Sequence, residues 1–319
     1  MFTKEVVGTA NAICGGWGNL GGGVTQLVMA ALLFPAFQKA FDGDAEKAWR
    51  TVCVVPAIVT IITGICIYKY SDDAPKGNYA ELKKHGTMAE VSAAASFRAG
   101  AINVNSWLLF VQYACCFGVE LTMNNAAALY FTDQFGLETA EAGAIASIFG
   151  FMNLFARPLG GYLSDKGNGY MGMKGRLIAQ TVCLLAEGAL VLVFAHTTSL
   201  SGSIATMVFF SLFVQAAEGT TYGIVPYVDP AATGAISGIV GAGGNVGAVC
   251  FGLVFQNLDY KQAFIVMGAT IFVSAIFSLG IVIKGHAGLI CGKDDEHKED
   301  GAVLTVPVKD VEEDDEISQ

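Results

Sequence analysis

Eight apolar stretches, each long enough to cross a lipid bilayer, constrain this chain more than any other feature. They lie approximately at residues 6–37, 50–69, 102–132, 142–163, 175–195, 202–226, 232–256 and 262–284. A membrane helix needs about 20 predominantly apolar residues. The chain of 319 residues is 53% hydrophobic and 14% charged, whereas a soluble domain carries about 25% charged residues. The sequence therefore predicts an all-α membrane protein with about eight transmembrane helices.

Negative charge is concentrated at the C-terminal end of the chain. Residues Gly285 to Gln319 hold eleven acidic residues and three lysines, which places −8 of the net charge of −10 in that segment. Such a segment is too polar to be buried, and we expect a disordered acidic tail. The remainder is nearly neutral and has no basic patch for phosphates, so the sequence excludes a nucleic-acid-binding protein.

Basic residues divide unevenly between the two sides of the membrane. If Met1 lies inside the cell, thirteen lysines and arginines fall in inside segments and four in outside loops, with Arg157 left within a span. Positive charge marks the cytoplasmic side, so both termini are assigned to the cytoplasm. We expect four parts: the remainder of an N-terminal bundle at 1–69, a cytoplasmic linker at 70–100, a C-terminal six-helix bundle at 101–284, and the tail at 285–319.

The cysteines and histidines indicate neither a metal site nor a cofactor. Seven of the eight cysteines lie in apolar stretches, where they are expected to pack as small apolar residues between helices. Their spacing fits neither a disulfide framework nor a zinc site, and the four histidines fall in expected loops or in the tail. We find no nucleophile beside a base and no phosphate-binding loop. The sequence predicts no metal, no cofactor and no enzyme activity.

The pattern Gly-x-x-Gly-Asn-[Leu/Val]-Gly occurs twice, at Gly15–Gly21 in the first span and at Gly241–Gly247 in the seventh. Small residues let membrane helices approach closely, which explains the glycines by packing alone. An asparagine facing lipid is unfavourable, so Asn19 and Asn245 are expected to face protein or water. Their amides could then donate to a small polar ligand between the two copies.

The two copies also bear on the completeness of the bundle. They lie six spans apart, and a repeat of six helices implies twelve spans in all. Only two spans precede the linker. We therefore expect this chain to be a fragment equivalent to helices five to twelve of a twelve-helix protein.

Arg157 is the one basic residue within an apolar span. One interpretation is that its side chain extends to the membrane interface. The other is that its planar guanidinium binds a planar oxyanion. No acidic residue is near it in sequence, and an intramembrane arginine marks a functional site by default. We therefore expect a bound anion to neutralise it.

The residues after Arg157 read Gly160-Gly161-Tyr162-Leu163-Ser164-Asp165-Lys166-Gly167. This run resembles the Gly-x-Leu-x-Asp-x-x-Gly loop of the major facilitator superfamily, which lies between helices two and three and again between helices eight and nine. The resemblance implies a cytoplasmic gate formed by Gly161, Asp165 and Arg176. Its aspartate would meet a helix N-terminus and nearby basic groups as the carrier changes state.

Together, the two glycine-asparagine segments and Ala-Arg-Pro-Leu-Gly-Gly-Tyr-Leu-Ser-Asp resemble the nitrate/nitrite porter family, in particular its eukaryotic high-affinity nitrate transporters. The likeness extends from Val6 to about Lys284. It implies that Arg157 is the anion-binding arginine of helix eight, with a helix-two partner outside this chain. It also implies substrate contacts for Asn19, Asn245, Tyr113 of helix seven and Tyr222 of helix ten. The nitrate-signature glycines would be Gly15, Gly18, Gly21, Gly241, Gly244 and Gly247.

One segment departs from this family. The short loop after helix ten is often basic in relatives, whereas here it reads Val228-Asp229-Pro230-Ala231.

Three acidic residues lie within apolar spans: Glu120, Glu187 and Glu218. Burial favours the protonated form of a carboxyl group, and proton-linked uptake needs such a carrier. Glu120, in the same span as Tyr113, is the preferred proton carrier. A purely structural role is the alternative for it, and the stronger interpretation for Glu187 and Glu218.

The resemblance implies a secondary active transporter that imports nitrate or nitrite across the plasma membrane by alternating access between two bundles. Coupling to protons is expected, with sodium as the alternative, and an accessory membrane subunit is a further expected partner. The fragment alone is expected not to transport. Two other hypotheses stay open: a non-transporting membrane subunit or sensor, and a carrier of another small anion or a sugar.

Overall fold

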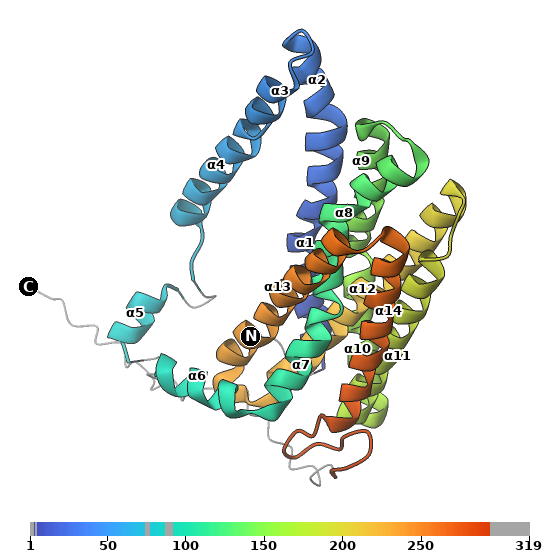
Figure 1. The fold of residues 1–319 in the computed structure, drawn as a ribbon. Helices are drawn as coiled ribbons and strands as arrows, with labels where there is room; N and C mark the ends of the chain where they lie inside the picture. The colour runs from blue at the N-terminus through green and yellow to red at the C-terminus, as the bar shows by residue number, and fades with distance from the viewer. Residues whose placement is uncertain (1–2, 4, 74–76, 87–91, 294–319) are drawn as a thin grey trace, which may run out of the picture.

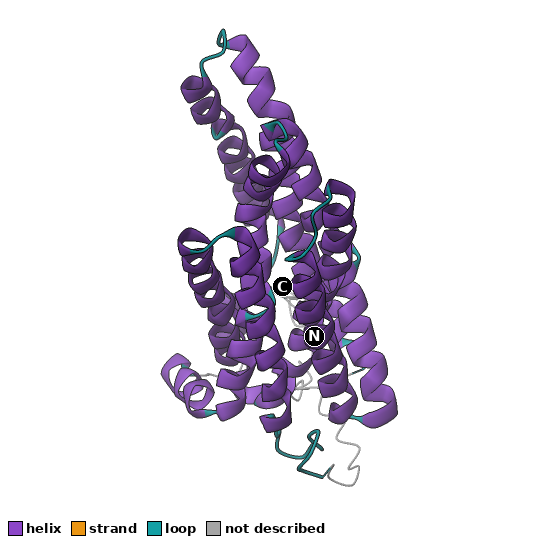
Figure 2. Ribbon diagram, turned by 45° about the vertical axis from the view of Figure 1, so that its right-hand side comes forward, coloured by secondary structure: helices purple, strands orange, loops and turns teal. Residues whose placement is uncertain are grey.

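The computed structural model describes residues 3, 5–73, 77–86 and 92–293, and these form helices joined by short turns (Figures 1 and 2). The α-helices are α1 (Val7–Val24), α2 (Phe34–Ala40), α3 (Ala45–Val52), α4 (Val54–Tyr70), α5 (Tyr79–Lys84), α6 (Ala93–Ile102), α7 (Val104–Ala114), α8 (Phe117–Phe135), α9 (Thr139–Phe151), α10 (Ala156–Met171), α11 (Met173–Phe194), α12 (Leu200–Val228), α13 (Thr233–Asn257) and α14 (Tyr260–Ile276). Between them lie a wider π-helical stretch, η1 (Thr25–Leu33), and the 3₁₀ turns η2 (Met152–Leu154), η3 (Pro230–Ala232) and η4 (Phe277–Gly280). The expected tail beyond residue 293 lies outside the described residues.

Eight helical segments are long and apolar enough to cross a membrane, which confirms the predicted fold class. They are Val7–Ala40, Ala45–Tyr70, Val104–Phe135, Thr139–Met171, Met173–Phe194, Leu200–Val228, Pro230–Asn257 and Tyr260–Gly280. Most bounds lie within a few residues of the predicted ones. The fourth segment differs most, because it continues as α10 to Met171 where the sequence predicted a loop after residue 163.

Two of these segments are interrupted near the middle of the bundle. The third segment bends at Cys115 and Cys116, between α7 and α8, and the fourth passes through η2 between α9 and α10. Pro158 accounts for the second break, because proline cannot donate a backbone hydrogen bond and its ring crowds the carbonyl four residues earlier. Its place in the first turn of α10 is one that proline tolerates. The breaks place side chains from helix ends inside the bundle.

The apolar core lies in the C-terminal bundle, where α11 packs against α10, α12 and α14, and α12 also packs against α10. Close approach of α10 to α12 depends on Gly160. A methyl group at that position would overlap the backbone of Ala216, including its carbonyl oxygen. Contact between two helix backbones is the role that small residues serve in membrane bundles.

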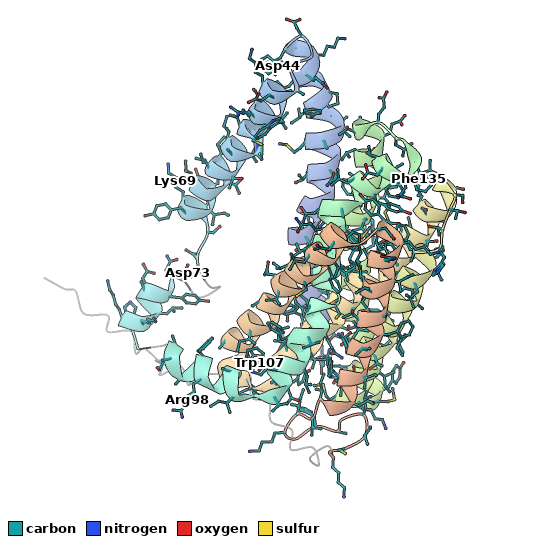
Figure 3. All side chains as sticks on the ribbon, in the orientation of Figure 1. Asp44, Lys69, Asp73, Arg98, Trp107 and Phe135 are labelled. Atoms are coloured by element: carbon teal, nitrogen blue, oxygen red, sulfur yellow. The ribbon has the colours of Figure 1, made fainter. Side chains whose placement is uncertain are left out.

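The N-terminal part reaches the bundle through α1, which packs against α9, α10 and α12, and through η1, which packs against α9. In contrast, α4 stands apart in Figure 1 and has no buried residue. The labelled side chains in Figure 3 mark the two ends of the molecule, with Asp44 and Phe135 toward one and Arg98 and Trp107 toward the other. Contacts of α1 and η1 therefore join the first part of the chain to the C-terminal bundle.

Candidate functional site

A group of polar side chains gathers where α1, α7, α8, α10 and α12 meet. We call it the Arg157 cluster, and its members are Asn19, Tyr113, Glu120, Asn153, Arg157 and Glu218. Except for Asn19, which is partly buried, each of these residues is buried. Polar groups in an apolar interior are unfavourable unless they bond to one another. The bonds within the cluster therefore decide what it can bind.

Arg157 is the central residue of the cluster. It lies in the first turn of α10 and is 5% exposed, so it does not extend to the membrane interface. Its Nη1 forms an ion pair with Glu218 Oε2, and its Nη2 donates to the hydroxyl of Tyr113 at 3.0 Å. Its Nε has no hydrogen-bond partner. No acidic residue lies near Arg157 in sequence, and its partner Glu218 comes from α12, 61 residues further along the chain.

The two acidic residues of the cluster share one amide. Asn19 Nδ2 lies 3.3 Å from Glu120 Oε2 and 3.5 Å from Glu218 Oε2. Glu120 Oε1 also accepts from Asn153 Nδ2 at 2.9 Å, whereas Glu218 Oε1 has no partner. The sequence reasoning missed Asn153, although residues four apart share one helix face and Asn153 precedes Arg157 by four.

The first glycine-asparagine segment approaches this cluster through Gly15. A methyl group at Gly15 would lie 2.7 Å from Arg157 Nε and 2.8 Å from its Cζ. A methyl group at Gly18 or Gly21 would meet no atom within 4 Å. The three signature glycines of this copy therefore differ in their surroundings. Gly15 is the one whose missing side chain leaves room for the Arg157 guanidinium.

We expect Gly15→Ala to destabilise the chain by about 1–3 kcal/mol, because the added methyl group must displace a buried charged side chain. Gly18→Ala is the matched control, since it lies in the same helix with open space around it and should stabilise the helix by about 0.5–1 kcal/mol. Thermal unfolding of the purified proteins in one detergent measures both. Equal melting temperatures for the two variants would contradict this role of Gly15.

The second glycine-asparagine segment serves the packing of α13 on α7 and α8. A methyl group at Gly244 would overlap the ring of Phe117, and one at Gly247 would overlap the carbonyl of Ala114. Asn245 is exposed and donates to the carbonyl of Gly241 in its own helix at 3.3 Å. The structure therefore does not bring Asn245 together with Asn19.

Tyr222 reaches the cluster through an aromatic contact. Its ring meets that of Tyr113 edge-on, with centroids 5.2 Å apart, and Tyr113 also stacks on Phe117 at 5.2 Å. The hydroxyl of Tyr222 donates to the carbonyl of Ser237 at 3.3 Å and lies 3.3 Å from a methyl group built on Gly241. Tyr222 therefore positions Tyr113 and connects α12 with the second glycine segment.

A second buried ion pair lies at the N-terminus of α1. Asp165 accepts from the backbone N–H groups of Gly8 at 3.0 Å and Thr9 at 2.6 Å, and from the Thr9 hydroxyl at 2.6 Å. Arg176 Nη1 donates to the same carboxylate at 2.7 Å. A helix N-terminus carries partial positive charge and free N–H groups. Asp165 thus ties the start of α1 to the C-terminal bundle.

The residues around this pair correct the expected gate loop. Gly161 and Asp165 lie within α10, which continues to Met171 and ends at Gly172, a residue with φ of 58°. Helix formation is sustained here by tertiary contacts, because Asp165 bonds to α1 and Arg176 rather than to its own backbone. A methyl group at Gly161 would lie 2.5 Å from the carbonyl oxygen of Gly8, so this glycine also permits the contact with α1.

Arg176 is fully buried on α11 and holds two further groups. Its Nη1 donates to the Ser164 hydroxyl and its Nη2 to the Tyr227 hydroxyl, both at 3.2 Å. The guanidinium also lies over the ring of Tyr227, 5.0 Å from its centroid. The sequence reasoning identified Asp165 and Arg176 but not Ser164, Thr9 or Tyr227.

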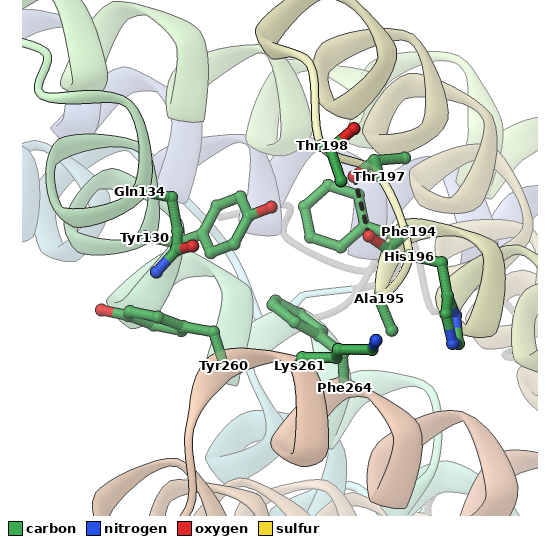
Figure 4. Close-up of a pocket in the computed structure, with 10 residues that line it drawn as sticks. All are labelled: Tyr130, Gln134, Phe194, Ala195, His196, Thr197, Thr198, Tyr260, Lys261 and Phe264. Atoms are coloured by element: carbon green, nitrogen blue, oxygen red, sulfur yellow. Dashed lines mark hydrogen bonds between the residues drawn. The ribbon is translucent and has the colours of Figure 1, made fainter.

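A cavity of about 200 Å³ lies at another place, where the ends of α8, α11 and α14 meet (Figure 4). It is lined by Tyr130, Gln134, Phe194, Ala195, His196, Thr197, Thr198, Tyr260, Lys261 and Phe264. None of these residues belongs to the Arg157 cluster. The cavity is therefore distinct from the candidate site.

The chain matches a model of the Major Facilitator Superfamily over residues 1–231. It is 37% identical over 295 residues to "High affinity nitrate transporter 2.5" of Arabidopsis thaliana, a match that covers 92% of this chain and 58% of the relative. It is 41% identical over 263 residues to "High-affinity nitrate transporter 2.3" of Oryza sativa subsp. japonica, with 82% and 51% covered. It is 28% identical over 359 residues to "Nitrate/nitrite transporter NrtP" of Nostoc punctiforme, with 90% and 70% covered.

The chain thus spans about half the length of the first two relatives. The family model covers well over half of the chain, and the eight helical segments agree with it. By these matches and this architecture, the chain belongs to the Major Facilitator Superfamily and, within it, to the nitrate/nitrite porter family.

Proposed function

We propose that the chain contributes to a secondary transporter that carries nitrate, with nitrite as a related substrate. The observation that carries this proposal is the buried guanidinium of Arg157, whose Nε has no partner. A planar oxyanion matches the guanidinium fork, which offers two parallel N–H groups. Tyr113, whose hydroxyl accepts from Arg157 and keeps its own proton to donate, and Asn19, whose amide now donates to Glu120 and Glu218, would be further donors. The names of the relatives support nitrate as the anion.

In this structure, the free edge of the guanidinium faces α1. Because Gly15 lies directly against Arg157, an anion reaches Nε only after α1 has moved away from α10. Such a movement is a step of alternating access, in which one bundle rocks against the other. The signature glycines of α1 would then serve as a sliding face.

The Asp165–Arg176 pair is the proposed gate for this movement. It holds the N-terminus of α1 in the present arrangement, and release of Gly8 and Thr9 would let α1 separate. Lys166 and Lys174, close to this pair in sequence, support a cytoplasmic location for the end of the bundle at which Asp165 and Arg176 lie. The gate and the Arg157 cluster both contact α1, so one rigid helix couples them.

The remaining expectations are part of the same proposal. The helices α1–α4 would belong to one bundle and α7–α14 to the other, joined by the cytoplasmic linker at 70–100. The protein would lie in the plasma membrane with its C-terminus in the cytoplasm. Transport would be driven by protons rather than sodium, with an accessory membrane subunit as partner, and without enzyme activity.

Nitrate should stabilise the purified chain against thermal unfolding. A ligand present at 100 times its Kd adds about 2.7 kcal/mol to the free energy of unfolding. Sulfate at equal ionic strength should add much less, since a tetrahedral dianion matches neither the charge nor the plane of the site. Melting temperatures in detergent measure both effects. A chain that is stabilised equally by nitrate and sulfate, or by neither, would refute the proposed substrate.

A further inference from the structure

We infer that Glu218 is the group that takes up a proton when an anion binds at Arg157. The anion then replaces the Glu218 carboxylate as the partner of the Arg157 guanidinium. The inference rests on the proposed function, which supplies the anion. It concerns the coupling at the same site and replaces Glu120, the carrier that the sequence suggested.

The first observation is the ion pair itself. Glu218 is fully buried in α12, and the side chain of Arg157 is 6% exposed. A buried charge must be paired, because the interior solvates it poorly. When an arriving anion takes the guanidinium as its partner, Glu218 loses the positive charge that balances it. A proton on Glu218 restores neutrality without any other movement of charge.

The second observation separates Glu218 from Glu120. Glu120 accepts hydrogen bonds from two amides, Asn153 and Asn19, and neither amide changes its charge when an anion binds. Glu218 depends on Arg157, and its second oxygen has no partner. Exchange of the guanidinium therefore breaks an ion pair of Glu218, whereas Glu120 interacts with the Arg157 charge without contacting it and keeps its two amide donors.

Other titratable groups surround Glu218 on the neighbouring helices. They are Tyr113 of α7, Cys116 at the start of α8, Glu120 of α8, Arg157 of α10, Glu187 of α11 and Tyr222 of its own helix. Farther along α10 and α11, Asp165 and Arg176 pair with each other. The cluster thus contains one guanidinium for two carboxyl groups.

The test measures nitrate affinity and proton uptake in the purified full chain. When nitrate is added to the wild-type chain in a weakly buffered solution, the chain should take up one proton from the solution per bound anion. Its Kd should rise by about tenfold per pH unit above the pH at which Glu218 ionises. Glu218→Gln mimics the protonated carboxyl, so it should bind nitrate with an affinity independent of pH and without proton uptake. Glu187→Gln removes another buried glutamate, one that no described hydrogen bond joins to the cluster, so this variant should still take up one proton per bound nitrate.

The outcomes distinguish the two claims. Nitrate binding without proton uptake in the wild type, or uptake that persists in Glu218→Gln, overturns the role of Glu218 and leaves the proposed function intact. A wild-type chain that binds no nitrate refutes the proposed function itself. Proton uptake by the wild type is measured without any substitution, so the inference is decided even where Glu218→Gln fails to fold.

Discussion

Asp165→Asn should destabilise the chain by about 3–5 kcal/mol, the effect expected when one partner of a buried ion pair is removed. Arg176 is fully buried and donates to this carboxylate. Asparagine keeps the size of the side chain but removes the negative charge that faces both Arg176 and the N-terminus of α1. Thermal unfolding in detergent measures the loss, and hydrogen exchange at Gly8 and Thr9 should accelerate because their acceptor is weakened.

Glu46→Gln is the matched control for that substitution. Glu46 pairs with Arg50 at 2.6 Å, but both side chains are about two-thirds exposed, at 68% and 65%. Exposed pairs contribute about 0–1 kcal/mol, so this control should change the melting temperature little. If Asp165→Asn and Glu46→Gln unfolded at the same temperature, Asp165 would not anchor α1.

Arg157→Lys should weaken nitrate binding by roughly 30- to 150-fold, which corresponds to the loss of about 2–3 kcal/mol from charge-assisted hydrogen bonds. Lysine retains the positive charge and can still pair with Glu218, so the charge balance of the cluster is preserved. It lacks the planar fork that binds two oxygens of one anion. The expected loss therefore isolates geometry from charge. Equilibrium binding of labelled nitrate to the purified variants measures it.

Arg98→Lys makes the same chemical change at an exposed position on α6 and should leave nitrate affinity unchanged. An Arg157→Lys variant with wild-type affinity would indicate that charge alone holds the anion, or that it binds elsewhere. Under either interpretation, the Arg157 guanidinium would not be the group that recognises the anion.

The helices were predictable because a membrane requires every spanning helix to be apolar along its length. A stretch of about 20 apolar residues has few alternatives to a spanning helix, and all eight segments were found. The end of α10 was not predictable in this way. Glycines and charged residues between Gly160 and Met171 favour a loop locally, and the helix persists because Asp165, Gly161 and Gly167 contact α1 and α11.

The candidate site was predictable in its central residue but not in its connections. Arg157 was identifiable because a charge within an apolar span is rare. Its pairing with Glu218 joins helices 61 residues apart and leaves no local pattern in the sequence. Orientation was equally hidden, since Gly15 and Gly18 are both signature glycines and only Gly15 meets Arg157. Sequence spacing predicts which face a residue lies on, whereas its partner depends on how the helices pack.

The central claim is that an anion replaces Glu218 as the partner of Arg157. An experimental structure of the chain determined with bound nitrate tests it most directly. We predict a nitrate oxygen within hydrogen-bond distance of the Arg157 guanidinium, with Glu218 withdrawn from Nη1 and α1 moved away at Gly15. Nitrate bound at another place, with the Arg157–Glu218 pair unchanged, would contradict the account.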